Sequence, residues 1–97
     1  TFFPDPWHKA RHHKRRLVSP DFAAVVASRL VPGGVWRLAT DWADYAEAMR
    51  ETLDGCDLLA NLHPGWAPRY ELRPLTKYEQ RGLDAGRTIF DLAYTRR

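Results

Sequence analysis

A rigid acidic corner near the start of the chain constrains its fold more than any other stretch. The corner is Pro4-Asp5-Pro6, in which each proline fixes its own φ and drives the preceding residue toward extended geometry. The pair Phe2-Phe3 before it is typical of the end of a buried strand. Open α/β sheets place ligands at the carboxyl ends of their strands. We therefore predict an α/β fold with Asp5 at a ligand-binding edge, although such a turn alone is more often a structural corner.

The corner leads directly into a dense basic run. Of the 15 Lys and Arg residues of the chain, whose net charge is +3, residues 9–16 hold Lys9, Arg11, Lys14, Arg15 and Arg16. This clustering is the electrostatic footprint of a phosphate binder, although basic runs also occur as solvated loops. His8, His12 and His13 lie nearby without a Cys or acidic partner at metal-ligand spacing, so we predict no metal site.

Local signals predict strands that alternate with helices. The runs 1–4, 35–39, 58–62 and 88–95 are expected to be strands, and residues 5–16 a loop. This order implies parallel neighbouring strands joined by right-handed crossovers. Asp5 and Asp41 each follow an apolar strand, so parallel pairing would bring both carboxylates to one edge of the sheet.

Three helices have recognisable starts. The first begins at Ser19, an N-cap that precedes Pro20, and the second is capped by Thr40 or Asp41. The third begins at Thr76, which forms a capping box with Glu79. Helical spacing predicts that the first helix turns Phe22, Val25, Val26, Arg29 and Leu30 toward a core, and the second Trp42, Tyr45, Ala46, Met49 and Leu53. The capping roles of Asp41, Thr76 and Glu79 are alternatives to any binding role.

The stretch FFPDPWHKARHHKRR, which ends at Arg16, resembles the signature of the bacterial tRNA (guanine-N7)-methyltransferases. Two further stretches, Ala39–Trp42 and Arg73–Gly82, resemble the same family, so the resemblance extends along almost the whole chain. It implies a Rossmann-like class I methyltransferase sheet, with parallel strands and an antiparallel last strand. It also implies transfer of a methyl group from S-adenosylmethionine (SAM) to N7 of a guanosine in the tRNA variable loop.

The resemblance also implies roles for individual residues. Asp5 resembles the residue assigned to catalysis and to the SAM site, and Lys9 and Asp41 resemble substrate contacts. The remaining positions divide into a substrate-binding stretch, Thr76, Lys77, Tyr78 and Glu79, and an RNA-interacting loop, Arg11, His12, His13, Lys14, Arg15 and Arg16. Tyr78 stands where the family usually has Phe, a change that keeps the ring and adds a hydroxyl.

The glycine-rich turn on which class I methyltransferases bind SAM has no counterpart in this sequence. We therefore expect residues 1–97 to form the C-terminal portion of one methyltransferase domain, inactive alone because the SAM-binding half is absent. No apolar run approaches the ~20 residues of a membrane span, and Cys56 is the single cysteine, so we expect a cytoplasmic protein. Two alternatives stay open: a non-catalytic basic RNA-binding module, and a non-functional remnant.

Overall fold

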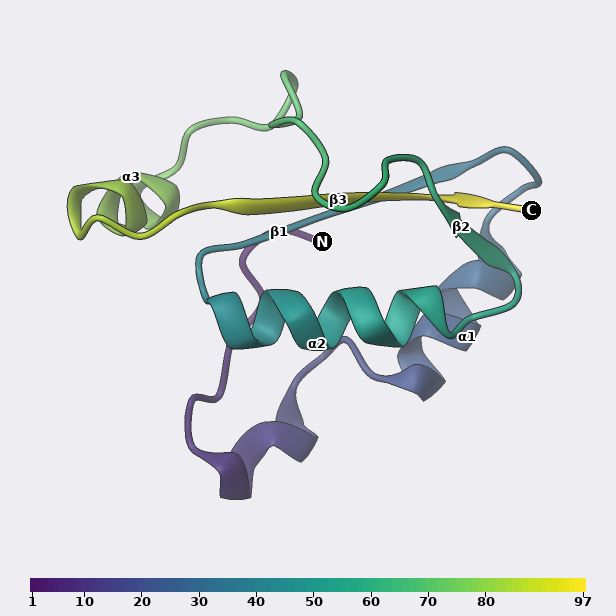
Figure 1. Ribbon diagram of the computed structural model, residues 1–97, viewed down its shortest axis with the longest axis horizontal. Helices are drawn as coiled ribbons and strands as arrows, with labels where there is room; N and C mark the ends of the chain where they lie inside the picture. Colours follow the sequence, from purple (N-terminus) through teal and green to yellow (C-terminus); the bar gives the residue numbers. More distant parts are fainter.

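The fold combines one small sheet with helices that pack on one of its faces and a further helix that lies beyond the end of the sheet (Figure 1). A computed structural model describes all residues from 1 to 97. In chain order the elements are the 3-10 helix η1 (Ala10–Arg15), α1 (Pro20–Arg29), β1 (Val35–Thr40), α2 (Ala43–Asp54), β2 (Leu59–Asn61), α3 (Lys77–Asp84) and β3 (Phe90–Arg96). The predicted α/β class is confirmed. None of the helices combines the length and apolar character needed to cross a membrane.

The sheet has the strand order β1-β3-β2, and β3 runs antiparallel to both neighbours. The predicted antiparallel last strand is therefore confirmed. The prediction of parallel pairing is wrong for β1 and β2, because β3 lies between them and takes the hydrogen bonds of both. Parallel pairing is limited to a bridge between Phe2 and Ala39, where the Phe3 N–H donates to the Ala39 carbonyl at 2.8 Å. Residues 1–4 thus lie beside β1 without forming the predicted strand.

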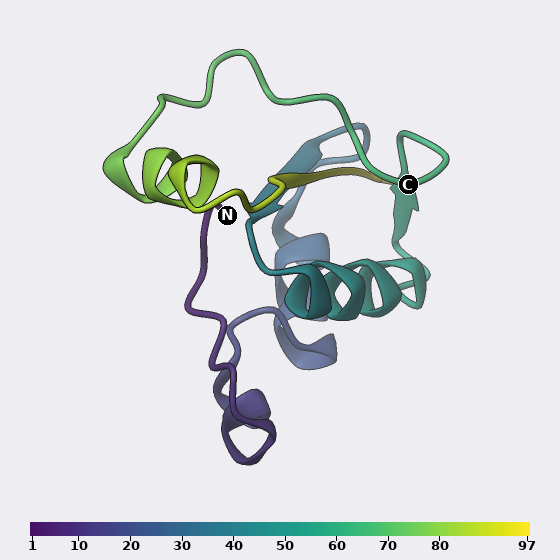
Figure 2. The ribbon, with the colours of Figure 1, turned by 60° about the vertical axis from the view of Figure 1, so that its left-hand side comes forward.

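Helix α2 supplies much of the buried apolar surface. Its Tyr45, Ala46, Met49 and Leu53 are fully buried, as helical spacing predicted. Burial of one large apolar side chain contributes about 1.5–3 kcal/mol to folding. Figure 2 shows α1 and α2 on the same side of the sheet, while the connection from β2 to α3 crosses the other side. This packing fixes β1, and with it the direction in which the chain leaves the sheet at Asp41.

The start of α1 was predicted correctly, but part of its buried face was not. The Ser19 hydroxyl accepts a hydrogen bond from the Phe22 N–H at 3.2 Å. Ala23 and Ala27 are the fully buried residues of the helix, whereas Val25 is half exposed. The buried stripe therefore follows small side chains, which let α1 approach the core closely. The helical spacing of large apolar residues does not reveal a buried stripe made of alanines.

The cap of α2 was predicted wrongly. The N-cap residue is Trp42, and no side chain caps the helix. The Thr40 hydroxyl instead accepts a hydrogen bond from the Trp42 N–H at 3.3 Å, just before the helix begins. The Asp41 carboxylate binds Arg87 and does not cap the helix. The predicted loop 5–16 also contains the short helix η1.

Helix α3 begins at the predicted residue with half of the predicted capping box. The Thr76 hydroxyl accepts a hydrogen bond from the Glu79 N–H at 3.3 Å. The reciprocal bond from the Thr76 N–H is missing, because the Glu79 carboxylate binds Arg69 and Arg73 instead. The side chain that the local pattern assigned to a cap is thus used for a tertiary contact.

Candidate functional site

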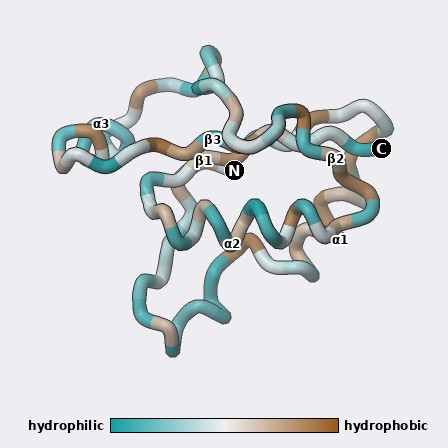
Figure 3. The backbone as a smooth tube through the Cα atoms, viewed as in Figure 1, coloured by the Kyte–Doolittle hydropathy of each residue, from teal (hydrophilic) through white to brown (hydrophobic).

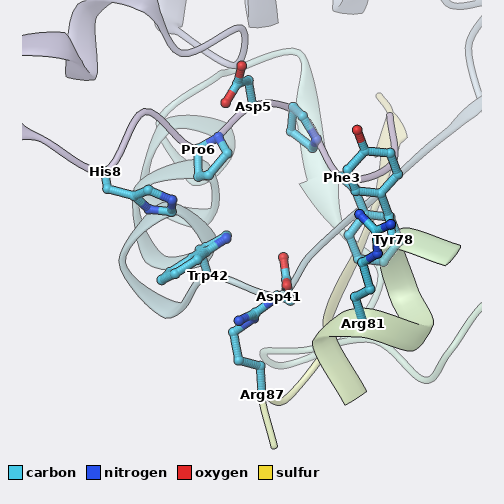
Figure 4. A pocket seen from close by; sticks show the side chains of 10 residues that line it. Phe3, Asp5, Pro6, His8, Asp41, Trp42, Tyr78, Arg81 and Arg87 are labelled. Carbon is cyan, nitrogen blue, oxygen red and sulfur yellow. Dashed lines mark hydrogen bonds and ion pairs between the residues drawn. The ribbon is translucent and has the colours of Figure 1, made fainter. Parts of the chain in front are cut away.

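Three segments that are distant in the sequence meet around a pocket of about 410 Å³ (Figure 4). The acidic corner forms one side, the residues after β1 form another, and α3 with the turn that follows it completes the wall. The lining residues are Phe3, Pro4, Asp5, Pro6, His8, Asp41, Trp42, Tyr78, Arg81 and Arg87. Asp5 and Asp41 lie on opposite sides of the pocket in Figure 4. The structure therefore places at one pocket the two aspartates that the sequence predicted to share one edge of the sheet.

The corner that carries Asp5 has an unusual backbone. Phe3 and Trp7, which flank Pro4-Asp5-Pro6, have φ values of 52° and 45°. These values lie in the left-handed region, which residues other than glycine rarely adopt. Such conformations cost about 1–3 kcal/mol each and gather at functional sites. The Asp5 side chain is exposed at the pocket, and no other side chain of the protein pairs with it. Both of its oxygens can therefore accept hydrogen bonds from a ligand.

Asp41 lies where the chain leaves β1, and it is held by an arginine from the turn before β3. The Arg87 Nε donates to Asp41 Oδ2 at 2.7 Å. The Asp41 side chain is only 12% exposed, so this ion pair is poorly screened by water. The Arg87 guanidinium also lies over the Trp42 ring at 5.0 Å, and the His8 ring contacts the same indole with centroids 3.9 Å apart. One oxygen of Asp41 is thus paired and the other faces no protein donor.

The stretch 76–79, which was predicted to bind substrate, is divided between different environments. Tyr78 lines the pocket and is 73% exposed. Thr76 caps α3, and Lys77 is exposed but does not line the pocket. Glu79 is only 2% exposed and lies in a buried ion cluster. The structure therefore places Tyr78 alone among these four residues at the pocket, and the substrate contacts of the other three stay predictions.

The buried ion cluster joins α3 to β3 through Arg73. The Arg73 Nε donates to Glu79 Oε1 at 3.0 Å, and its terminal nitrogens bind the Asp91 carboxylate. The Arg69 Nε donates to Glu79 Oε2 at 2.9 Å. Burial disfavours the charged form of Glu79, but hydrogen bonds from Arg69 and Arg73 outweigh it and hold the pKa of Glu79 below its ordinary value. Burial likewise opposes the charge on Arg73, yet its two carboxylate partners raise the pKa of Arg73 above the ordinary value.

Arg73 also reaches the segment that leads into the acidic corner. Its guanidinium lies over the rings of Phe2 and Phe3, at 5.4 Å and 5.7 Å from their centroids. The ion cluster lines a second cavity of about 760 Å³ that includes Glu79 and Asp91. Because this arginine contacts α3, β3 and the chain before Asp5, it links two walls of the pocket, α3 and the acidic corner, to the sheet without lining the pocket itself.

The predicted RNA-interacting residues lie mainly in η1, a hydrophilic segment on the far side of α2 from the sheet (Figure 3). Arg11, His13, Lys14 and Arg15 are exposed, and His12 is half-buried. The Arg15 guanidinium lies 5.1 Å from the centroid of the Trp7 ring. Lys9 is exposed beside η1 and does not line the pocket. These cations are therefore open to solvent and to any polyanion that approaches this side.

Arg16 differs from the other cations of the basic run. Its side chain is only 7% exposed and donates to Asp44 Oδ2 at 2.9 Å and to the Pro6 carbonyl at 2.6 Å. It also lies over the Tyr45 ring at 4.6 Å. The hydrogen bond from Arg16 holds the pKa of Asp44 below its ordinary value. Arg16 thus connects the acidic corner to α2, and its predicted RNA contact stays a prediction.

Two arginines that organise the site were not singled out from the sequence. Arg87 lies 46 residues from Asp41, and Arg73 lies 18 residues from Asp91. Pairs so far apart leave no periodic or local signal. Arg73 is the first residue of the stretch Arg73–Gly82, which resembles the methyltransferase family. This resemblance is the only feature of the sequence that could have indicated a role for Arg73. No three His, Cys, Asp or Glu side chains converge as a metal site would require.

Comparison with known proteins identifies the family. A family model described as "Putative methyltransferase" matches residues 1–92. The chain belongs to this methyltransferase family. The chain is also 61% identical over 97 residues to the tRNA (guanine-N(7)-)-methyltransferase of Nocardioides sp. (strain ATCC BAA-499 / JS614). It is 59% identical over 99 residues to the protein of the same name from Cutibacterium acnes, and 55% identical over 97 residues to that of Aromatoleum aromaticum.

Membership of the methyltransferase family confirms the resemblance that began with the acidic corner. The matches include 100%, 99% and 100% of this chain, respectively. They include only 38%, 36% and 38% of the three relatives. The chain therefore spans somewhat more than a third of the length of these methyltransferases.

Proposed function

We propose that the protein carrying this chain is a SAM-dependent tRNA (guanine-N7-)-methyltransferase, and that the chain provides the substrate side of its active site. In this proposal residues 1–97 are the C-terminal part of a Rossmann-like class I domain. The observation that carries the proposal is the convergence of Asp5, Asp41 and Tyr78 on one pocket. The names of the relatives support the choice of tRNA and of guanine N7.

The pocket suits a reaction that needs positioning more than proton transfer. Guanine N7 carries a lone pair and no proton, so its methylation requires no general base at the nucleophile. It requires the base to be held with N7 in line with the methyl group, and such positioning can supply a large part of a rate enhancement. Carboxylates accept hydrogen bonds from the N–H groups of the guanine Watson–Crick edge. Asp5 and the unpaired oxygen of Asp41 provide such acceptors.

The charges of the pocket suit the product as well as the substrate. Methylation of N7 places a positive charge on the base, and fixed carboxylates stabilise a charge that develops during reaction. Asp5 has no cationic partner, so its negative charge is available for this purpose. Arg87 neutralises part of the charge of Asp41. We therefore assign the main electrostatic role to Asp5 and a substrate-orienting role to Asp41.

SAM, when bound, would supply the electrophilic methyl group. Asp5 is the residue of this chain best placed to hold it, since an unpaired carboxylate at the pocket can accept hydrogen bonds from hydroxyl or ammonium donors. The 97 residues contain no glycine-rich turn after a strand. The residues present thus fit one side of a SAM site, and the remainder of the site falls to other parts of the enzyme.

The exposed cations of η1 would hold the tRNA backbone. Arg11, Lys14 and Arg15 are open to solvent, and contacts of Lys and Arg to phosphates position a nucleic acid without reading its sequence. Binding through such contacts weakens steeply as salt rises, because each neutralised phosphate releases counterions. In this proposal η1 binds the tRNA while the pocket receives the target guanosine.

A hybrid enzyme tests the proposed function. It is the Nocardioides relative with its 97 aligned residues replaced by this chain, which is 61% identical to them. We expect the hybrid to form 7-methylguanosine in the variable loop of tRNA, and to leave a transcript with adenosine at the target position unmethylated. The unreplaced relative, assayed beside it, controls for the rest of the enzyme. A folded hybrid that does not methylate tRNA, beside an active parent, would contradict the proposal.

The exposed cations also favour a second candidate function, a basic RNA-binding module without catalysis. Salt-steep tRNA binding by a hybrid that lacks methylation would favour this module. Salt-insensitive binding would remove it. A chain that melts cooperatively as a monomer would exclude the third possibility, a poorly folded remnant.

A further inference from the structure

Helix α3 packs its backbone directly against the Asp41 carboxylate at Gly82. A Cβ atom at position 82 would lie 2.8 Å from Asp41 Oδ2 and 3.3 Å from Asp41 Cβ. Contacts this short require one of the two groups to move. Gly82 is buried in the second turn of α3. Every residue other than glycine carries a Cβ, so the observed position of Asp41 depends on glycine at position 82.

The helix itself gives no reason for a glycine at this position. The φ of Gly82 is not among the positive values of the chain, so the backbone does not need the freedom of glycine here. Glycine in the interior of a helix is less favourable than alanine. The feature that explains the residue is therefore the contact with Asp41.

Arg87 holds the same carboxylate oxygen from another direction. Its Nε donates to Asp41 Oδ2 at 2.7 Å, and Trp42 supports the guanidinium through its ring. Figure 4 shows Arg87 beside Asp41 at the wall of the pocket. Oδ2 is thus enclosed between the α3 backbone and Arg87. Oδ1 is left as the oxygen that can accept a hydrogen bond from a ligand.

We propose that Gly82 and Arg87 are positioning residues that fix the rotamer of Asp41, so that one oxygen is presented to the guanine in the pocket. This inference rests on the proposed function for the identity of the ligand. The enclosure of Asp41 Oδ2 by Gly82 and Arg87 is independent of that function. Gly82 does not line the pocket and Arg87 does, but in this inference both act on the guanine through Asp41.

A double-mutant cycle in the hybrid enzyme tests the inference. Arg87→Gln and Gly82→Ala are each made with Asp41 intact and in the Asp41→Ala background. With Asp41 present, we expect each change to lower kcat/KM for tRNA by roughly tenfold. In the Asp41→Ala background the same changes should cost less than about twofold, because there is no carboxylate left to misplace. Equal losses in both backgrounds would overturn the inference.

Two matched controls separate positioning from general damage. Arg81→Gln removes another pocket-lining arginine, one that makes no ion pair with Asp41, so its cost should be equal in the two backgrounds. Gly55→Ala makes the same change as Gly82→Ala at a position where the added Cβ meets only ordinary contacts at 3.5 Å. It should leave kcat/KM within about twofold of the unmodified hybrid.

The unfolding temperature supplies a readout that does not depend on activity. Gly82→Ala should lower it with Asp41 present, because the added methyl meets the carboxylate. The fall should be smaller in the Asp41→Ala background, where the 2.8 Å contact with Oδ2 is gone and only the 3.3 Å contact with the Cβ of residue 41 remains. A rise in both backgrounds, or an equal fall in both, would overturn the inferred contact between helix α3 and the Asp41 carboxylate. If the unmodified hybrid is inactive, the proposed function fails. The unfolding temperatures of the four variants then still test whether Gly82 packs against the Asp41 carboxylate.

Discussion

Two pairs of carboxylates lie on different sides of α3, and the chain uses them differently. Asp5 and Asp41 line an open pocket, and three of their four oxygens have no protein partner. Glu79 and Asp91 are buried, and Arg73 binds both of them. All four side chains are carboxylates, so what separates the pairs is their burial and the number of their arginine contacts. The comparison teaches that a carboxylate can serve a ligand only where the protein leaves its oxygens unpaired.

The largest effect expected from this comparison concerns the buried pair. Replacing Arg73 with Met leaves two buried carboxylates without their shared cation. Loss of one partner of a buried ion pair costs about 3–5 kcal/mol, so we expect the unfolding free energy of the hybrid to fall by about that amount in urea denaturation. Asp5→Asn on the open side should change it by less than about 0.5 kcal/mol. Equal losses of unfolding free energy in the two variants would contradict the difference that we infer between the buried and the open pair.

The second prediction concerns the open pair. Asp5→Ala removes a fixed charge from the pocket, and loss of one such electrostatic group typically lowers kcat by about 10²–10³-fold. We expect methylation by the hybrid to fall by that amount, measured by single-turnover transfer of labelled methyl groups. The Kd for tRNA should stay within about threefold, because the phosphate contacts of η1 are unchanged. Full activity in this variant would remove Asp5 from the mechanism.

The third prediction applies the comparison to cations. Arg16 is buried beside Asp44, whereas Lys14 is exposed and has no carboxylate partner. We expect Lys14→Gln to reduce the slope of log Kd against log salt for tRNA by about 1. Arg16→Gln should leave that slope unchanged and lower the unfolding temperature instead. A reversed pattern would show that the buried cation reaches the RNA.

The smallest expected effect is a pH dependence. Folding holds the pKa of Glu79 below its ordinary value of 4.5. A carboxyl group of this kind contributes stability that is present above its unfolded pKa and is lost as pH falls through its folded pKa. We therefore expect the unfolding free energy to decline below about pH 4.5, and Glu79→Gln to make the decline shallower. Urea titrations from neutral to acidic pH measure both curves, and parallel curves would contradict the assignment.

Much of the fold could be predicted because its signals are local. The Ser19 cap, the buried face of α2 and the start of α3 at Thr76 each depend on residues within one or two helical turns. The strand order could not be predicted in the same way. β3 comes last in the chain but lies between β1 and β2, and no local pattern encodes which strands become neighbours.

In the site, too, the features set by neighbouring residues could be predicted, and those set by residues distant in the sequence could not. The acidic corner was visible because Pro4-Asp5-Pro6 is rigid in any context, and the structure places Asp5 at a pocket with Asp41. The environment of Glu79 could not be predicted from the sequence, because it depends on Arg69, Arg73 and the fold of the intervening loop. A capping pattern explains the Glu79 backbone but not its carboxylate.

The most direct measurement replaces each of the four carboxylates with its amide in the hybrid enzyme and records 7-methylguanosine formation and unfolding temperature on the same samples. The variants are Asp5→Asn, Asp41→Asn, Glu79→Gln and Asp91→Asn. The account predicts that the first two lose methylation while the protein stays folded, and that the last two lose mainly thermal stability. Full methylation by Asp5→Asn, or loss of methylation without loss of stability in Glu79→Gln, would contradict it.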